Sequence, residues 1–164
     1  MPLILRRLAV LFAIAGGLAG CAVALMTVTS VTGRAITSQP IPGDIEITQF
    51  GIALCIALCL PWAQLHGSNI IVDFFTQGVR ERTLRVLDAF GAFLLAVMVG
   101  VLAWRTAAGA LSVHDAFETT MILELPMWIA YAVLAPGLAL TAVIALVQVK
   151  LHLTGQERHL GVRP

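Results

Sequence analysis

The stretch LPMWIAYAVLAPGLALTAVIALVQV, residues 125–149, runs for 25 residues without an Asp, Glu, Lys or Arg. A helix rising about 1.5 Å per residue needs about 20 residues to cross a hydrocarbon core of about 30 Å, so this stretch can span a membrane. Three further charge-free stretches occupy residues 8–33, 47–72 and 89–104. With polar ends trimmed and the short third stretch extended, the sequence predicts transmembrane helices over about 8–32, 47–66, 86–107 and 126–149.

The composition agrees with a chain that lies mostly in lipid. Hydrophobic residues make up 59% of the 164 residues and charged residues 12%, whereas a soluble domain is about 25% charged. Disorder is excluded, because disordered segments are poor in apolar residues. We therefore expect an all-α membrane protein, with residues 1–164 forming a single four-span domain whose two termini share one face.

The basic residues predict which face that is. Eight of the ten lie in the N-terminus, the second loop and the tail: Arg6, Arg7, Arg80, Arg82, Arg85, Lys150, Arg158 and Arg163. The opposite face receives Arg34 and Arg105 together with five acids: Asp44, Glu46, Asp115, Glu118 and Glu124. Since short cytoplasmic loops collect Lys and Arg, both termini are expected in the cytoplasm. The net charge of +1 provides no surface for nucleic acid.

The N-terminus also resembles a lipoprotein signal. Arg6 and Arg7 precede an apolar run that ends in Leu18-Ala19-Gly20-Cys21, which would make Cys21 the lipidated residue. The apolar run, however, continues through residues 22–26 without a polar tether. The sequence therefore favours an uncleaved first span.

Residues that carry chemistry are sparse. Cys55 and Cys59 are four residues apart, but no His or carboxylate is expected at their depth, so packing is favoured over a metal site. Metalloprotease, phosphate-loop and nucleophile-elbow motifs are absent from the sequence. With Arg105 placed at the outer end of the third span, no ionisable residue is expected at mid-depth for a proton relay. The sequence predicts neither an enzyme nor a cofactor.

Other features concern helix packing. Gly16, Gly20 and Ala24 form one row of small residues, and Ala9, Ala13 and Gly17 form another; such rows let helices approach closely. Pro61 and Pro136 predict kinks whose freed carbonyls need a donor nearby. Three aromatic residues are expected in one belt at the outer interface: Trp104, Trp128 and Tyr131.

The loop between the second and third spans allows two interpretations. Phe74, Phe75 and Val79 could share the lipid-facing side of a short interfacial helix, with Gln77 and Glu81 toward water. A plain basic connector fits the loop equally well.

The order of these features resembles the small membrane subunit of tripartite ATP-independent periplasmic (TRAP) transporters, the DctQ-like family. The resemblance covers about residues 34–149. It rests on Arg34 closing the first span, Glu46 entering the second, the segment from Asn69 to Val72-Asp73, and Glu118 before the run Leu125-Pro126-Met127-Trp128. Many family members carry His where this chain has Asn69, which suggests a divergent subgroup.

The resemblance implies a non-catalytic scaffold that forms a heterodimer with a large permease subunit. That subunit would hold the sodium and organic-acid sites, and a periplasmic binding protein would deliver the substrate to it. The implied location is the bacterial inner membrane. The residues implied as family-motif or partner-contact positions are Glu46, Asn69, Asp73, Glu118, Pro126 and Trp128. The small-residue rows, with the second and fourth spans, would face the large subunit. Two alternatives remain: the small subunit of a tripartite tricarboxylate transporter, and a four-span structural or assembly protein.

Overall fold

The computed structural model describes residues 3–37, 42–66 and 81–154. Four helices account for most of them: α1 (Leu3–Thr37), α2 (Asp44–Leu65), α4 (Glu81–Asp115) and α5 (Trp128–Thr154). Each is long and apolar enough to cross a membrane. Within the described ranges the chain forms no strand beyond one isolated bridge between Thr119 and Pro126. The predicted all-α fold with four membrane-spanning helices is confirmed.

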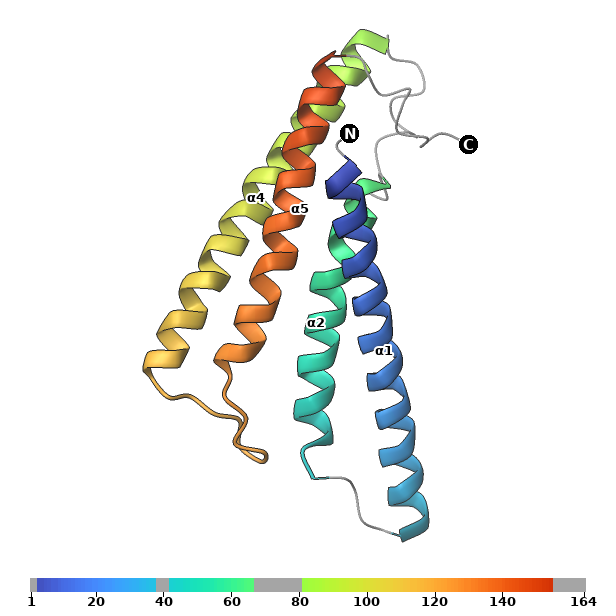
Figure 1. The fold of residues 1–164 in the computed structure, drawn as a ribbon, viewed down its shortest axis with the longest axis vertical. Helices are drawn as coiled ribbons and strands as arrows, with labels where there is room; N and C mark the ends of the chain where they lie inside the picture. Colours follow the sequence, from blue (N-terminus) through green and yellow to red (C-terminus); the bar gives the residue numbers. More distant parts are fainter. Residues whose placement is uncertain (1–2, 38–41, 67–80, 155–164) are drawn as a thin grey trace.

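The four helices lie side by side as two hairpins (Figure 1). α1 packs on α2, α4 packs on α5, and α2 packs on α5, whereas α1 and α5 barely touch. The spatial order is therefore α1, α2, α5, α4. α1 begins and α5 ends at the same end of the bundle, as an even number of spans requires. Because α2 and α5 are the inner pair, their contact joins the two halves of the chain.

The α2–α5 contact is built on a proline and a glycine. Pro61 is fully buried in α2, and its missing N–H frees the carbonyl of Ala57 one turn earlier. Gly137 of α5 packs directly on this carbonyl, since a Cβ at Gly137 would clash with the Ala57 oxygen. The hydrogen that Gly137 carries in place of a Cβ is therefore directed at this oxygen. The sequence predicts that the carbonyl freed by Pro61 needs a group nearby. In the structure this carbonyl, at Ala57, meets the backbone of α5.

The α1–α2 contact uses one of the two small-residue rows. A Cβ at Gly16 would lie 2.9 Å from Cys59 Sγ and 3.1 Å from the Cys55 carbonyl oxygen. A Cβ at Gly20 would lie 3.0 Å from Cys55 Sγ. The row is therefore covered by α2 of the same chain, and the expectation that it faces a partner subunit is wrong. A row of small residues can accept any helix of suitable shape. The helix that follows α1 in the chain is the nearest one available.

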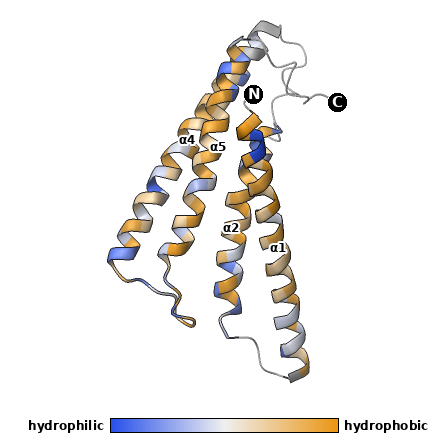
Figure 2. Ribbon diagram, viewed as in Figure 1, coloured by the Kyte–Doolittle hydropathy of each residue, from blue (hydrophilic) through white to orange (hydrophobic). Residues whose placement is uncertain are grey.

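Hydrophobic residues predominate along all four helices (Figure 2). Large hydrophobic side chains are exposed on all four helices, including Leu25 on α1, Ile56 on α2, Met98 on α4 and Leu146 on α5. In water such a surface would drive aggregation. In a bilayer these side chains meet lipid tails as apolar as themselves, so the surface agrees with the predicted membrane location.

α4 is longer than the third predicted span. The helix continues to Asp115, eight residues beyond the predicted end at residue 107. Trp128 packs edge-on against His114, with ring centroids 5.5 Å apart, whereas Trp104 lies ten residues earlier on α4, about 15 Å along the axis. The expectation that Trp104 and Trp128 lie in one belt is therefore wrong. The sequence predicts a span that ends near residue 107, just past Arg105, and the helix itself continues to Asp115.

Candidate functional site

The bundle end that carries the acidic residues is held together by Glu46. This side chain lies in the first turn of α2, and its two carboxylate oxygens accept hydrogen bonds from the backbone of residues 116–127, the connection between α4 and α5. Oε1 accepts from the Ile122 N–H at 2.9 Å and Oε2 from the Leu123 N–H at 3.0 Å. Hydrogen bonds to an ionised acceptor are stronger than neutral ones. Glu46 thus fastens the second hairpin to the first.

The α4–α5 connection is folded so that it can present these two N–H groups. The Thr120 N–H donates to the Leu125 carbonyl at 2.9 Å, and the Leu125 N–H donates to Thr120 Oγ1 at 3.0 Å. Glu124 has a φ of 52°, in the left-handed region. Successive N–H groups of such a turn form a concavity that binds an anion. Here the anion is a side chain of the same protein.

Gly43, the residue before α2, lies under the same turn. Its φ is 75°, in the left-handed region where a side chain is strained. A Cβ at this position would also clash with the side chain of Leu123. Glycine is therefore required here for two independent reasons, and Leu123 covers it closely.

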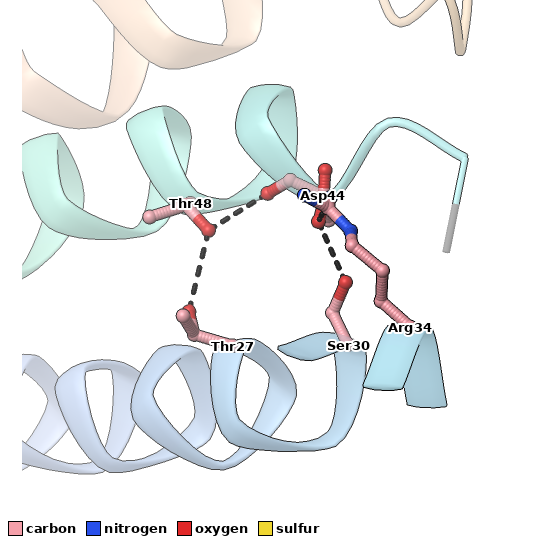
Figure 3. A network of polar contacts seen from close by, with 5 residues as sticks. All are labelled: Thr27, Ser30, Arg34, Asp44 and Thr48. Carbon is pink, nitrogen blue, oxygen red and sulfur yellow. Dashed lines mark hydrogen bonds and ion pairs between the residues drawn. The ribbon is translucent and has the colours of Figure 1, made fainter. Parts of the chain in front are cut away.

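A second polar network joins α1 and α2 next to Glu46 (Figure 3). Ser30 Oγ, which is fully buried, donates to Asp44 Oδ2 at 2.6 Å. Arg34 reaches the same oxygen at 3.5 Å. One turn deeper, Thr48 Oγ1 donates to the Asp44 carbonyl at 2.7 Å and lies 3.5 Å from Thr27 Oγ1. Asp44 and Glu46 therefore secure α2 to elements on its two sides.

At the other end of the α2–α5 contact lies a buried pair of glutamines. Gln64 Nε2 donates to Gln148 Oε1 at 2.6 Å, and Gln148 Nε2 donates to the Gln64 carbonyl oxygen at 2.7 Å. Their exposed fractions are 5% and 7%. Sequence reasoning missed this pair, although an amide inside an apolar run needs a partner and could have been found on that ground.

An apolar groove of about 310 Å³ lies between the Glu46 contact and the glutamine pair. Its lining comes from α1, α2 and α5 and includes Ala22, Phe50, Gly51, Ile129 and Val133. Among the described residues, no group of three His, Cys, Asp or Glu side chains could hold a metal ion.

The geometry is that of a membrane bundle whose polar groups serve helix packing. The family model for the DctQ component of tripartite ATP-independent periplasmic transporters matches residues 23–155. The chain belongs to this family. A search of curated proteins and a search of solved structures found no match. A small membrane component of a TRAP transporter is thus the function class shown for this DctQ-family chain.

The predicted contact positions are only partly brought together. Glu46 touches the α4–α5 connection, where the Glu118 carbonyl accepts from the Met127 N–H at 3.0 Å and the Glu118 side chain is exposed. Pro126 forms the bridge with Thr119, and Trp128 begins α5, 38% exposed. In this DctQ-family chain, four of the six positions thus surround one connection.

The remaining two predicted positions are Asn69 and Asp73. They lie outside the described residues, as do most of the residues of the predicted interfacial helix. The cysteines contribute to packing, as predicted: Cys55 and Cys59 lie against Gly20 and Gly16 of α1.

Proposed function

We propose that this chain is the fixed scaffold subunit of a TRAP transporter and forms a heterodimer with a large permease subunit. The observation that carries the proposal is the family match over residues 23–155. The bundle supports a static role, because its inner helices are fastened at both ends, by Glu46 and by the Gln64–Gln148 pair. A rearrangement of α2 against α5 or the α4–α5 connection during transport would have to break one of these contacts.

The charges favour one orientation in the bacterial inner membrane. Arg6 and Arg7 near the start of α1 and Lys150 near the end of α5 lie at one end of the bundle. The other end carries Asp44, Glu46 and the acidic α4–α5 connection. Placing the basic end in the cytoplasm satisfies the rule for positive charges. The connection then faces the periplasm, where a binding protein would deliver its ligand.

The substrate and the coupling ion are assigned to the other subunits. On this proposal the large subunit binds sodium and an organic acid, and the periplasmic binding protein supplies that acid. The small chain contributes neither site. Its groove is almost wholly apolar and suits neither an organic anion nor a sodium ion.

Co-purification and uptake test the proposal together. A tagged chain, co-expressed with the large subunit and solubilised in mild detergent, is expected to recover that subunit in equal amount. A strain lacking the chain should lose sodium-dependent uptake of the acid carried by the cognate binding protein. Uptake should return with the wild-type chain and with Gly17→Ala, whose added methyl group meets nothing within 4 Å. Recovery as a lone stable monomer, with uptake intact in the deletion strain, would refute the scaffold role.

A further inference from the structure

The outward face of α4 carries a regular seam of exposed residues. Ala89 and Ala96 are 5% and 4% exposed and lie on the side that packs on α5. Arg105 follows Ala96 by nine residues, or two and a half turns, so it points the opposite way. Exposed residues alternate at spacings of four and three along this side: Leu87, Gly91, Leu94, Met98, Val101, Arg105, Ala108 and Ser112. We call these eight residues the Arg105 face. Residues at these spacings lie along one face of an α-helix.

Arg105 lies deep along the bundle. A Cβ at Gly100 would meet Ala142, and one at Gly109 would meet Tyr131, so Arg105 between them is level with about Pro136. The neighbouring Gly137 packs on Ala57, which is 13 residues, or about 20 Å, from the start of α2. Arg105 is thus level with the middle of α2. The sequence places Arg105 at the outer end of a span that ends near residue 107, whereas α4 itself continues for ten residues beyond Arg105 to Asp115.

A guanidinium group at this depth needs a partner. Arg105 is exposed, and it forms no ion pair within the described ranges 3–37, 42–66 and 81–154. From the level of Ala57, α2 extends 8 residues, about 12 Å, to Leu65 and 13 residues, about 20 Å, to Asp44, so the Arg105 side chain does not reach the level of either end of α2. Charged residues in transmembrane segments rarely face lipid and usually pair with another group. The face that presents Arg105 therefore does not fit a bare lipid surface.

We propose that the Arg105 face is the surface on which a transmembrane helix of the large permease subunit packs, with Arg105 paired to an Asp or Glu of that helix. This inference rests on the proposed function. A carboxylate matches the planar fork of the guanidinium and neutralises its charge. Arg105 is the one charged residue among the eight, and a polar residue within a mostly apolar helix contact can fix the register of the two helices. A second copy packed in parallel through this face would place Arg105 opposite Arg105, and the next acid along the same side, Asp115, lies ten residues further on.

Three variants test this contact in the co-expressed complex. Arg105→Leu is expected to lower recovery of the large subunit with the tagged chain by about tenfold or more, since a charge on the partner is left unpaired. Arg105→Lys should retain most of the recovery. Lys150→Leu, which removes a positive charge from an exposed position near the end of α5, serves as the matched control and should leave recovery unchanged. Because Arg105 is exposed, the thermal stability of the isolated chain should stay the same in all three.

A photo-crosslinking residue at Met98 identifies the neighbour directly. An adduct with the large subunit is expected, and the crosslinked peptide should contain or adjoin an Asp or Glu. Exchange of that acid for Arg, combined with Arg105→Asp, should restore the recovery that each change alone reduces.

Failure of the inference and failure of the proposed function give different results. If wild-type chain recovers the large subunit and Arg105→Leu recovers it equally, the inference is wrong and the proposed function stands. An adduct with a second copy, or with lipid alone, likewise contradicts the inference and leaves the proposed function intact. If the wild-type chain recovers no large subunit, the proposed function fails and the inference fails with it.

Discussion

At Gly137 the absence of a side chain lets two helix backbones touch. The residue packs on the Ala57 carbonyl that Pro61 leaves without its helical donor. Glycine in a helix interior normally costs stability relative to alanine. At this position the sign reverses, because even one methyl group would push α5 away from α2.

The effect can be measured by comparing two glycines. Gly137→Ala is expected to lower stability by about 1–3 kcal/mol, as overpacking does elsewhere. Gly17→Ala should be neutral or stabilise by up to about 1 kcal/mol, because its methyl group meets nothing. Thermal unfolding in detergent, followed by circular dichroism, reports both. Equal midpoints for the two variants would contradict the close approach of α2 and α5.

Glu46→Gln tests the fastening of the α4–α5 connection. The amide replaces one of the two accepting oxygens by a donor and removes the charge, so it cannot accept from both N–H groups. Hydrogen exchange at the Ile122 and Leu123 amides is expected to accelerate. Glu124→Gln changes an exposed acid of the same connection and should leave both rates as they are. Unchanged exchange in Glu46→Gln would mean that the connection holds its shape without this carboxylate.

Among the elements, α2 has the largest number of distinct roles. It carries the cysteines that meet α1, the proline and carbonyl that meet α5, and the acids that hold both neighbours at one end. The second predicted span was recognised from its missing charges alone. The contacts of this helix cannot be predicted in the same way, because they join residues up to 84 positions apart in sequence, as for Gln64 and Gln148.

The glutamine pair is suited to a double-mutant cycle between α2 and α5. Gln64→Leu and Gln148→Leu each leave a buried amide with a lost partner and should cost about 1–3 kcal/mol. The double variant should cost less than the sum, with a coupling of about 0.6–2 kcal/mol as measured for hydrogen bonds between membrane helices. Unfolding of the four proteins under one set of conditions gives the coupling. Strict additivity would show that the two side chains act independently.

At the scale of the whole molecule, the sequence predicts that the chain lies in a membrane and how many helices it forms. It does not predict how the helices are ordered in space. Charge-free stretches indicate which residues lie in lipid. Such spans must satisfy their backbone hydrogen bonds internally, which predicts the all-α fold. The third span is predicted to end near Arg105, since a charge within an apolar run normally signals an interface, whereas α4 itself extends to Asp115. The small-residue rows fit several neighbours equally well, and only the assembled structure selects α2. The sequence predicts Glu46 as a contact position, but its partners are backbone groups that carry no sequence signal.

The orientation is testable on the intact chain. After exchange of the three native cysteines for serine, Glu118→Cys should react with a membrane-impermeant maleimide added to whole spheroplasts. Gln156→Cys in the tail should react only after the membrane is opened. Both follow from the placement of basic residues in the cytoplasm. The reverse labelling pattern would invert the topology and place the α4–α5 connection inside the cell.

The contact between α2 and α5 also has a consequence for biogenesis. A ribosome releases α2 long before α5, so the first hairpin enters the membrane with Gln64 and the Ala57 carbonyl still awaiting their partners on the last helix. Until α5 inserts, the nascent half-protein exposes these polar groups to lipid. We therefore expect a chain truncated before α5 to be degraded faster than the full chain, which pulse-chase labelling measures.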